Sequence, residues 1–245
     1  MGSRALIGGT GLNQLPGLEI VAEHDLTTPW GKPSHPIREG VLEGSKLYFI
    51  ARHGIPHSIA PHRINYRANV WSLKELGVCE VVAVNAVGAI PATMPPGHLV
   101  LPDQLIDYSW GREGSFFDGV ERPLGHIDFT EPYDSELRAR LAAAAERLGL
   151  AYSGAATYAC TQGPRLETAA EVRRLQQDGC DLVGMTGMPE AALAREAGLA
   201  YAAICMVVNP AAGLSSEPIT EEAIHAVLEQ ESHLVAQLIR GYLAG

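Results

Sequence analysis

Short apolar runs alternate along the chain with longer stretches in which apolar residues recur every three or four positions. The short runs predict β-strands and the longer stretches predict amphipathic helices. Strands are expected at residues 5–7, 18–25, 38–42, 47–51, 81–84, 99–108, 157–160, 181–183 and 202–208. Helices are expected at residues 65–76, 134–148, 168–178, 189–197 and 220–243. The unbroken β-branched run at 81–84 is typical of a central strand that is buried on both faces.

The order of these elements indicates the fold class. Strands alternate with helices through most of the chain, which favours a parallel or mixed sheet with helices on both faces. A chain of 245 residues is within the range of one large α/β domain. We therefore expect a single α/β domain over residues 1–245.

Polar or glycine-containing clusters follow several of the expected strands. They are Gly9-Thr10, Arg52-His53, Asn85-Ala86, Thr186 and Asn209. In open α/β sheets, ligands bind beyond the carboxyl ends of the strands. The sequence therefore predicts one ligand site to which all these strand ends contribute.

The stretch 161–190 presents two pairs of side chains just ahead of expected helix starts. Thr168 and Glu171 have the spacing of a capping box, so a helix is expected to begin near Thr168, after Leu166-Glu167. Met185-Thr186 similarly precede the next helix, for which Pro189 suits the first position. Helix starts offer unpaired N–H groups to anions. Local pattern alone favours a plainer role for Thr186, that of a capping residue.

The composition of the chain argues against several classes of binding partner and location. The net charge of −10 argues against non-specific nucleic-acid binding. No apolar run has the length of a membrane span, and the first residues do not have the pattern of a signal peptide. The four cysteines lie far apart without metal or redox spacing, as in a reduced cytoplasmic protein. Prolines interrupt the segment that holds His53, His57 and His62, so a metal site is not expected there.

Two local patterns leave alternatives open. The glycine loop after the first strand fails the dinucleotide fingerprint, because Gln14 occupies the third glycine position. Phosphate binding and a simple tight turn both remain possible for that loop. The long segment 109–132 is typical of a lid or an interface. Within it, Asp128 and Glu131 are either a carboxylate pair as in glycosidases or, more in keeping with the pattern, part of a solvated loop.

Taken together, the motifs resemble those of the trimeric purine nucleoside phosphorylase and methylthioadenosine phosphorylase family. The resemblance covers nearly the whole chain through IGGTG, ARHG, HRINYRANVWSLKELG, VNAVGA, GHIDFTEPYD, TQGPRLET and VGMTGMPEAALARE. It implies reversible phosphorolysis of purine nucleosides to free base and a ribose 1-phosphate. It also implies a mixed, partly barrel-like sheet and a homotrimer.

The resemblance also implies roles for particular residues. Phosphate, a co-substrate, would be held without any metal or cofactor, and Met185 would pack on the ribose. His126, in the long loop, would reach the ribose bound by a neighbouring subunit. The implied phosphate ligands are Thr10, Arg52, His53, Asn85, the backbone at Ala86, and Thr186.

The expected base pocket contains Leu166, Glu167, Asn209 and Ala211. Family members that use adenosine carry two aspartates spaced D-x-D, where this chain reads Asn209-Pro210-Ala211. Members that use 6-oxopurines carry an asparagine and a glutamate, here Asn209 and Glu167. A carboxylate accepts a hydrogen bond from N1–H, which a 6-oxopurine has and an adenine lacks. The resemblance therefore implies a 6-oxopurine nucleoside.

The sugar end of the expected pocket is apolar. The position where related enzymes place a histidine falls on Thr220, followed by Ile224, and such a wall suits a methylthio group. The whole sequence is most similar to bacterial members that act on S-methyl-5′-thioinosine. An inosine or guanosine phosphorylase and a methylthioadenosine phosphorylase are the alternatives. A nicotinamide-dependent oxidoreductase and a non-catalytic nucleoside-binding module are the alternatives from other classes.

Overall fold

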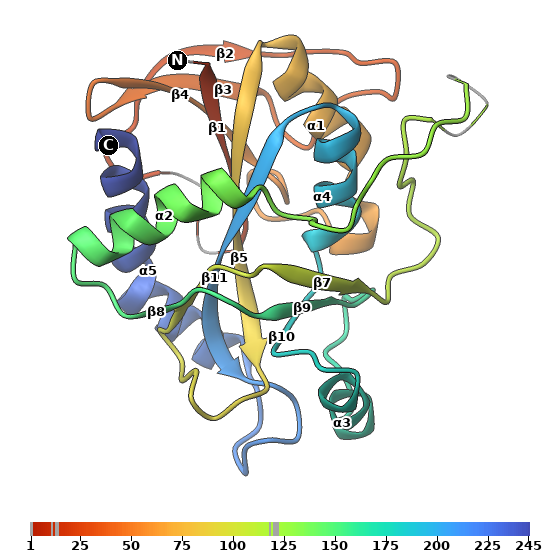
Figure 1. Ribbon diagram of the computed structural model, residues 1–245, viewed down its shortest axis with the longest axis vertical. Helices are drawn as coiled ribbons and strands as arrows, with labels where there is room; N and C mark the ends of the chain where they lie inside the picture. Colours follow the sequence, from red (N-terminus) through yellow and green to blue (C-terminus); the bar gives the residue numbers. More distant parts are fainter. Residues whose placement is uncertain (1, 11, 13–14, 118, 120–122) are drawn as a thin grey trace.

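The computed structural model describes residues 2–10, 12, 15–117, 119 and 123–245 (Figure 1). Gly11 and Gln14 of the glycine loop lie outside them. The strands are β1 (Ser3–Gly8), β2 (Glu19–His24), β3 (Ile37–Leu42), β4 (Ser45–Ala51), β5 (Val78–Ala89), β6 (Leu99–Val100), β7 (Gln104–Asp107), β8 (Tyr152–Ser153), β9 (Thr157–Cys160), β10 (Leu182–Gly184) and β11 (Ala200–Pro210). The helices are α1 (Tyr66–Glu75), α2 (Ser135–Arg147), α3 (Ala169–Gln177), α4 (Gly187–Glu196) and α5 (Glu221–Ala244), with a 3-10 turn at Pro61–Arg63.

The sheet branches at β5 and closes on one side into a small barrel. Strands β2, β3, β4 and β1 lead to the first half of β5, and β1, β4, β5 and β11 run parallel. The second half of β5 pairs with β10, which pairs with β9. The segment of β8 and β9 pairs with that of β6 and β7, and β6 returns to β11. This ring of pairings confirms the expected mixed, partly barrel-like sheet.

Two apolar cores lie on opposite faces of the central strands. On one face α1 and α4 pack together, and on the other α2 packs against α5 (Figure 1). Side chains of β5 alternate between the two cores: Val81 and Ala83 join the first, whereas Val82 and Val84 join the second. A strand covered on both faces needs apolar residues at every position, which explains its unbroken apolar run.

Helix starts follow the capping signals in the sequence. Thr168 and Glu171 form the expected capping box, with Glu171 N donating to Thr168 Oγ1 at 3.1 Å and Thr168 N donating to Glu171 Oε2 at 2.7 Å. Helix α4 differs in detail, because it starts at Gly187 and Met188 has non-helical dihedral angles. Regular helical geometry therefore begins at Pro189.

Strand bounds depart from the expectations in several places, and β8 has no counterpart among the expected strands. Pro102 divides the expected strand 99–108 into β6 and β7, as a residue without an N–H group does in a sheet. Strand β5 extends five residues beyond Val84, through the polar Asn85, because β10 and β11 supply hydrogen-bond partners that the local pattern does not reveal. In the part of the chain that the structure describes, no helix is long and apolar enough to cross a membrane.

Candidate active site

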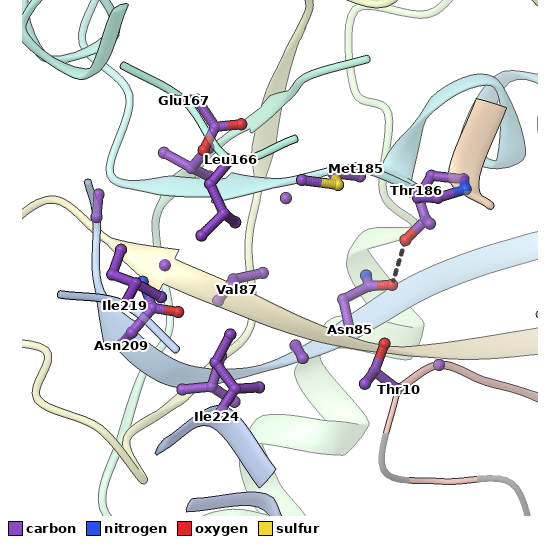
Figure 2. Close-up of a pocket in the computed structure, with 18 of the residues that line it drawn as sticks. Thr10, Asn85, Val87, Leu166, Glu167, Met185, Thr186, Asn209, Ile219 and Ile224 are labelled. Atoms are coloured by element: carbon purple, nitrogen blue, oxygen red, sulfur yellow. Dashed lines mark hydrogen bonds between the residues drawn. The ribbon is translucent and has the colours of Figure 1, made fainter. Parts of the chain in front are cut away.

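A cavity lies where the carboxyl ends of the central strands meet, and we call it the strand-end cavity (Figure 2). It collects residues from all the strand-end clusters that the sequence singles out. Its lining consists of Gly9, Thr10, Arg52, His53, Pro61, Asn85, Ala86, Val87, Gly88, Leu166, Glu167, Val183, Gly184, Met185, Thr186, Val208, Asn209, Ala211, Ala212, Ile219 and Ile224. The expected convergence is therefore present, and of the expected site residues only Thr220 and His126 lie outside this lining.

Close packing of backbone brings the end of β1 to the cavity. A Cβ atom at Gly9 would lie 2.5 Å from the carbonyl oxygen of Val84 and 2.8 Å from Nη1 of Arg52. Any side chain there would push β1 away from β5 or displace the guanidinium. Glycine at this position therefore lets Thr10 reach the cavity beside Arg52.

Arg52 is a buried cation with a complete set of partners. Its side chain is 1% exposed, and it donates from Nε and Nη2 to the two carboxylate oxygens of Glu190 at 2.7 and 2.8 Å. Nη1 donates to the carbonyl oxygen of Val84 at 3.1 Å. The Glu190 carboxylate raises the pKa of Arg52 against the opposing effect of burial, so the guanidinium stays charged.

Glu190 is a site-supporting residue that the sequence analysis missed. It is fully buried on α4 and also accepts a hydrogen bond from Tyr201 Oη at 2.9 Å. The bidentate geometry fixes the plane of the guanidinium next to the cavity. The only available signal was a carboxylate among apolar neighbours near a helix start, which does not by itself identify a partner 138 residues away.

His53 lies beside Arg52 as a neutral imidazole. Its Nδ1 is 2.7 Å from the carbonyl oxygen of Ile59, so Nδ1 carries the hydrogen and Nε2 is left as an acceptor. Its ring stacks on His57, with centroids 4.3 Å apart. Burial, followed by the charge of Arg52, lowers the pKa of His53 to about 4. At neutral pH this side chain therefore adds no positive charge to the cavity.

The lowered pKa of His53 predicts a loss of stability in mild acid. Below the ordinary pKa of 6.5 the unfolded chain binds a proton that the folded chain does not take up until about pH 4. The free energy of unfolding therefore decreases as the pH falls through that window, and at pH 5 the decrease is about 2 kcal/mol. Urea unfolding of the wild-type protein and His53→Gln at pH 7.5 and pH 5 measures this difference. An identical pH dependence in the two proteins would exclude the neutral buried state.

Asn85 and Thr186 meet across the cavity. Thr186 Oγ1 donates to Asn85 Oδ1 at 3.2 Å, and both residues are buried (Figure 2). Thr186 occupies the N-cap position of α4 but makes no side-chain capping bond. The capping interpretation of Thr186 is therefore wrong in detail, because its hydroxyl faces another polar side chain of the cavity.

At the other end of the cavity, Glu167 and Asn209 supply a carboxylate and an amide. Glu167 Oε1 accepts a hydrogen bond from Thr161 Oγ1 at 2.6 Å, which orients the carboxylate. Asn209 Nδ2 donates to the carbonyl oxygen of Pro210 at 2.6 Å, leaving its second N–H and its oxygen for a ligand. Leu166 and Ala211 line the same cavity.

A register irregularity in β11 helps to place Asn209. Val207 pairs with Val87 and Asn209 pairs with Gly88, so Val208 is an extra residue. Neighbouring side chains of a regular strand point to opposite faces, whereas a bulge re-aims them. Val208 and Asn209 consequently both line the strand-end cavity.

The start of α5 contributes an apolar wall that differs from the expected one. Thr220 is exposed, and its Oγ1 accepts a hydrogen bond from Ala223 N as an ordinary N-cap. Thr220 therefore does not line the cavity, contrary to the expectation from the sequence. Ile219 takes that place, together with the expected Ile224 (Figure 2). The sequence signal was present, since an isolated apolar residue precedes the N-cap.

His126 lies in the long loop, exposed, and outside the cavity lining of its own chain. In the same loop Asp128 Oδ1 accepts hydrogen bonds from Thr130 N and Thr130 Oγ1. These bonds lower the pKa of Asp128 and make it a turn-forming residue on the surface. The solvated-loop interpretation of Asp128 is therefore confirmed against the carboxylate-pair alternative. Over the described residues, no group of three His, Cys, Asp or Glu side chains is arranged to hold a metal ion.

Comparison with known proteins identifies the family. Residues 3–244 match the model of the phosphorylase superfamily. The chain is 53% identical over 224 residues to a probable S-methyl-5′-thioinosine phosphorylase of Pseudomonas syringae pv. tomato, covering 91% of each chain. It is 45% identical over 240 residues to a 6-oxopurine nucleoside phosphorylase of Pyrococcus furiosus, covering 96% of this chain and 89% of that one.

A solved structure of a related enzyme has the same fold as this chain. Methylthioadenosine phosphorylase from Schistosoma mansoni in complex with adenine superimposes with a TM-score of 0.95 at 30% identity, covering 100% of this chain and 91% of that one. The superposition over the whole chain and the sequence matches over nearly its full length indicate the same family. The chain belongs to the phosphorylase superfamily.

Proposed function

We propose that this protein is a nucleoside phosphorylase that cleaves a 6-oxopurine nucleoside, with S-methyl-5′-thioinosine as the preferred substrate. An oxygen of inorganic phosphate attacks C1′ of the sugar, the bond from C1′ to the purine nitrogen breaks, and that electron pair leaves with the base. The base takes up a proton and becomes hypoxanthine, and the sugar becomes 5-methylthioribose 1-phosphate. The observation that carries the proposal is a single cavity with anion donors at one end and Glu167 with Asn209 at the other.

Phosphate is assigned to the end of the cavity formed by Thr10, Arg52, His53, Asn85 and Thr186. Hydroxyl and amide groups donate to phosphate oxygens, and Arg52 supplies a positive charge beside them. The neutral His53 offers Nε2 to a P–OH group. These groups hold the attacking oxygen in place, so the rate enhancement at this end comes from orientation of phosphate.

The base is assigned to the end formed by Glu167 and Asn209. Glu167 accepts N1–H of a 6-oxopurine, and the Asn209 amide donates to N7, where it stabilises negative charge on the departing base. An adenine presents a lone pair at N1, which would face the carboxylate without a hydrogen. Polar groups left unpaired in a buried pocket reject such a ligand. Relatives named for 6-oxopurine and methylthioinosine substrates support this assignment.

The 5′ end of the sugar is assigned to the wall of Val208, Ile219 and Ile224. A hydroxyl placed against these side chains would lose its water without gaining a hydrogen bond. A methylthio group makes apolar contacts there instead. The wall therefore favours the methylthio substrate over inosine.

A nucleoside panel tests the proposal. We expect release of hypoxanthine from S-methyl-5′-thioinosine only when phosphate is added, with kcat/KM at least about tenfold above that for inosine and for methylthioadenosine. Chromatography of the free base provides the measurement. Base release without phosphate would contradict phosphorolysis. A higher kcat/KM for inosine would refute the methylthio assignment, and a higher value for methylthioadenosine would refute the 6-oxopurine assignment.

We extend the proposal to a homotrimer in which His126 of each subunit completes a neighbour's sugar site. Its support is the exposed apolar surface of the long loop, where Trp110, Leu124 and Ile127 are 72%, 76% and 37% exposed. Sedimentation velocity measures the assembly, and a monomeric mass at micromolar concentration would contradict it.

A further inference from the structure

Arg112 lies outside the strand-end cavity, yet its guanidinium contacts two segments that form the cavity. The residue is half-buried in the long loop that follows β7. Nη2 donates to the carbonyl oxygens of Thr161 and Gln162 at 3.1 and 2.9 Å. Nη1 donates to the carbonyl oxygen of Met185 at 2.9 Å and also to that of Met188.

Three further contacts fix the plane of this guanidinium, and one of them is a hydrogen bond from Nη1 to Tyr66 Oη at 3.4 Å. Nε donates to Gln162 Oε1 at 3.2 Å, and the group lies over the ring of Tyr66, 5.7 Å from its centroid. Planar arginine geometry matches such a set of acceptors, which a lysine cannot satisfy together. All three nitrogen atoms of the guanidinium are thus directed at neighbouring segments.

The two bridged segments present side chains at different parts of the cavity. Thr161 donates to Glu167 through its hydroxyl, so the first segment carries the base-side carboxylate. Met185 and Met188 flank Thr186, whose hydroxyl bonds to Asn85. Paired strands β9 and β10 lead into these segments, and Thr161 N donates to the carbonyl oxygen of Gly184 at 2.8 Å. Beyond the strand ends, Arg112 is the side chain that joins the segment of the base-side carboxylate to both Met185 and Met188, on either side of the phosphate-side hydroxyl.

We propose that Arg112 is a positioning residue for phosphorolysis: it holds the segment 161–167 and the segment 185–188 at the spacing that a bound nucleoside and phosphate require. Arg112 is absent from the cavity lining, so the proposal assigns it no contact with the substrate. Misplacement of reacting groups by about 1 Å costs on the order of 10²-fold in rate. The inference rests on the proposed function, because the spacing matters only if both ligands bind this cavity together.

The chain offers a matched control in Arg138. Its Nε donates to the carbonyl oxygen of Pro102 at 2.8 Å, and its Nη2 donates to those of Leu101 and Gly154. Arg138 thus also joins two backbone segments, but the segments are those of β6 and β8, and it does not line the cavity. If the loss of any arginine that joins two backbone segments lowered the activity, Arg112→Ala and Arg138→Ala would lose activity alike.

The test compares Arg112→Ala, Arg112→Lys and Arg138→Ala at equal folded fraction. We expect kcat/KM for S-methyl-5′-thioinosine to fall about 10²-fold in Arg112→Ala and to change less than about threefold in Arg138→Ala. Arg112→Lys keeps the charge and is expected to fold but to remain well below wild type, because it lacks the planar fork. Added guanidinium ion is expected to restore part of the activity of Arg112→Ala alone. Equal losses in the Arg112→Ala and Arg138→Ala variants would overturn the proposal.

Crystal structures separate this inference from the proposed function. If wild-type protein cleaves no nucleoside, the proposed function fails, and the structure of Arg112→Ala decides the positioning role. Displacement of the segments 161–167 and 185–188 relative to each other supports that role. Unchanged segments overturn it, whatever the activity.

Discussion

Glu190→Ala is expected to lower the free energy of unfolding by about 3–5 kcal/mol, because it leaves the buried guanidinium of Arg52 without its carboxylate. Neither side chain is exposed to water that could replace the lost bonds. The freed guanidinium is also expected to leave the plane that faces phosphate, so phosphorolysis is lost even where the variant folds. Urea unfolding and initial rates measure the two effects.

Two companion variants sharpen this test. Glu190→Gln retains the shape and one acceptor oxygen, so it is expected to fold better than the alanine variant while still raising the KM for phosphate. Asp25→Ala removes the carboxylate that pairs with Lys32 on the surface, where both side chains are 63% exposed, and little change in stability is expected. A loss below about 1 kcal/mol in Glu190→Ala would show that the buried pair does not stabilise the fold.

Substitutions at Glu167 and Asn209 are expected to change which base is cleaved. Glu167→Gln removes a charged acceptor from N1–H, and we expect kcat/KM for S-methyl-5′-thioinosine to fall about 10–100-fold, the equivalent of one charged hydrogen bond. Asn209→Asp places a carboxylate where an amide donor stands and is expected to shift the ratio of activities toward methylthioadenosine. Paired kcat/KM measurements on the two nucleosides give this ratio.

Glu171→Gln serves as the matched control, since it makes the same chemical change in the adjoining capping box. It is expected to leave the ratio of the two activities unaltered. An unchanged ratio in Asn209→Asp would remove Asn209 from base selection. An unchanged kcat/KM in Glu167→Gln would show that the carboxylate does not contact the base.

The parts of this molecule that depend on local signals are predictable from sequence. The capping box at Thr168 locates the start of α3, and the apolar run at 81–84 marks the strand covered on both faces. Parallel strands end at the same edge of a sheet, so the sequence alone indicates that Arg52, Asn85 and Asn209 lie together.

The parts that depend on pairing between distant segments are not predictable in this way. The partner of Arg52 lies 138 residues away on α4, and no periodicity connects the two positions. The bulge at Val208 changes which side chains face the cavity, although the surrounding strand keeps its apolar pattern. Ile219 rather than Thr220 lines the cavity because both residues precede the helix, with Thr220 as its extended N-cap, so the helical repeat does not set the direction of either side chain.

The pairing of Arg52 with Glu190 affects how strongly the cavity attracts anions from solution. The two charges cancel, His53 is neutral at pH 7, and Glu167 adds a negative charge at the far end. The whole chain carries a net charge of −10. The proposed phosphate end therefore lacks long-range attraction for an anion, and phosphate bound there would be held by short-range hydrogen bonds.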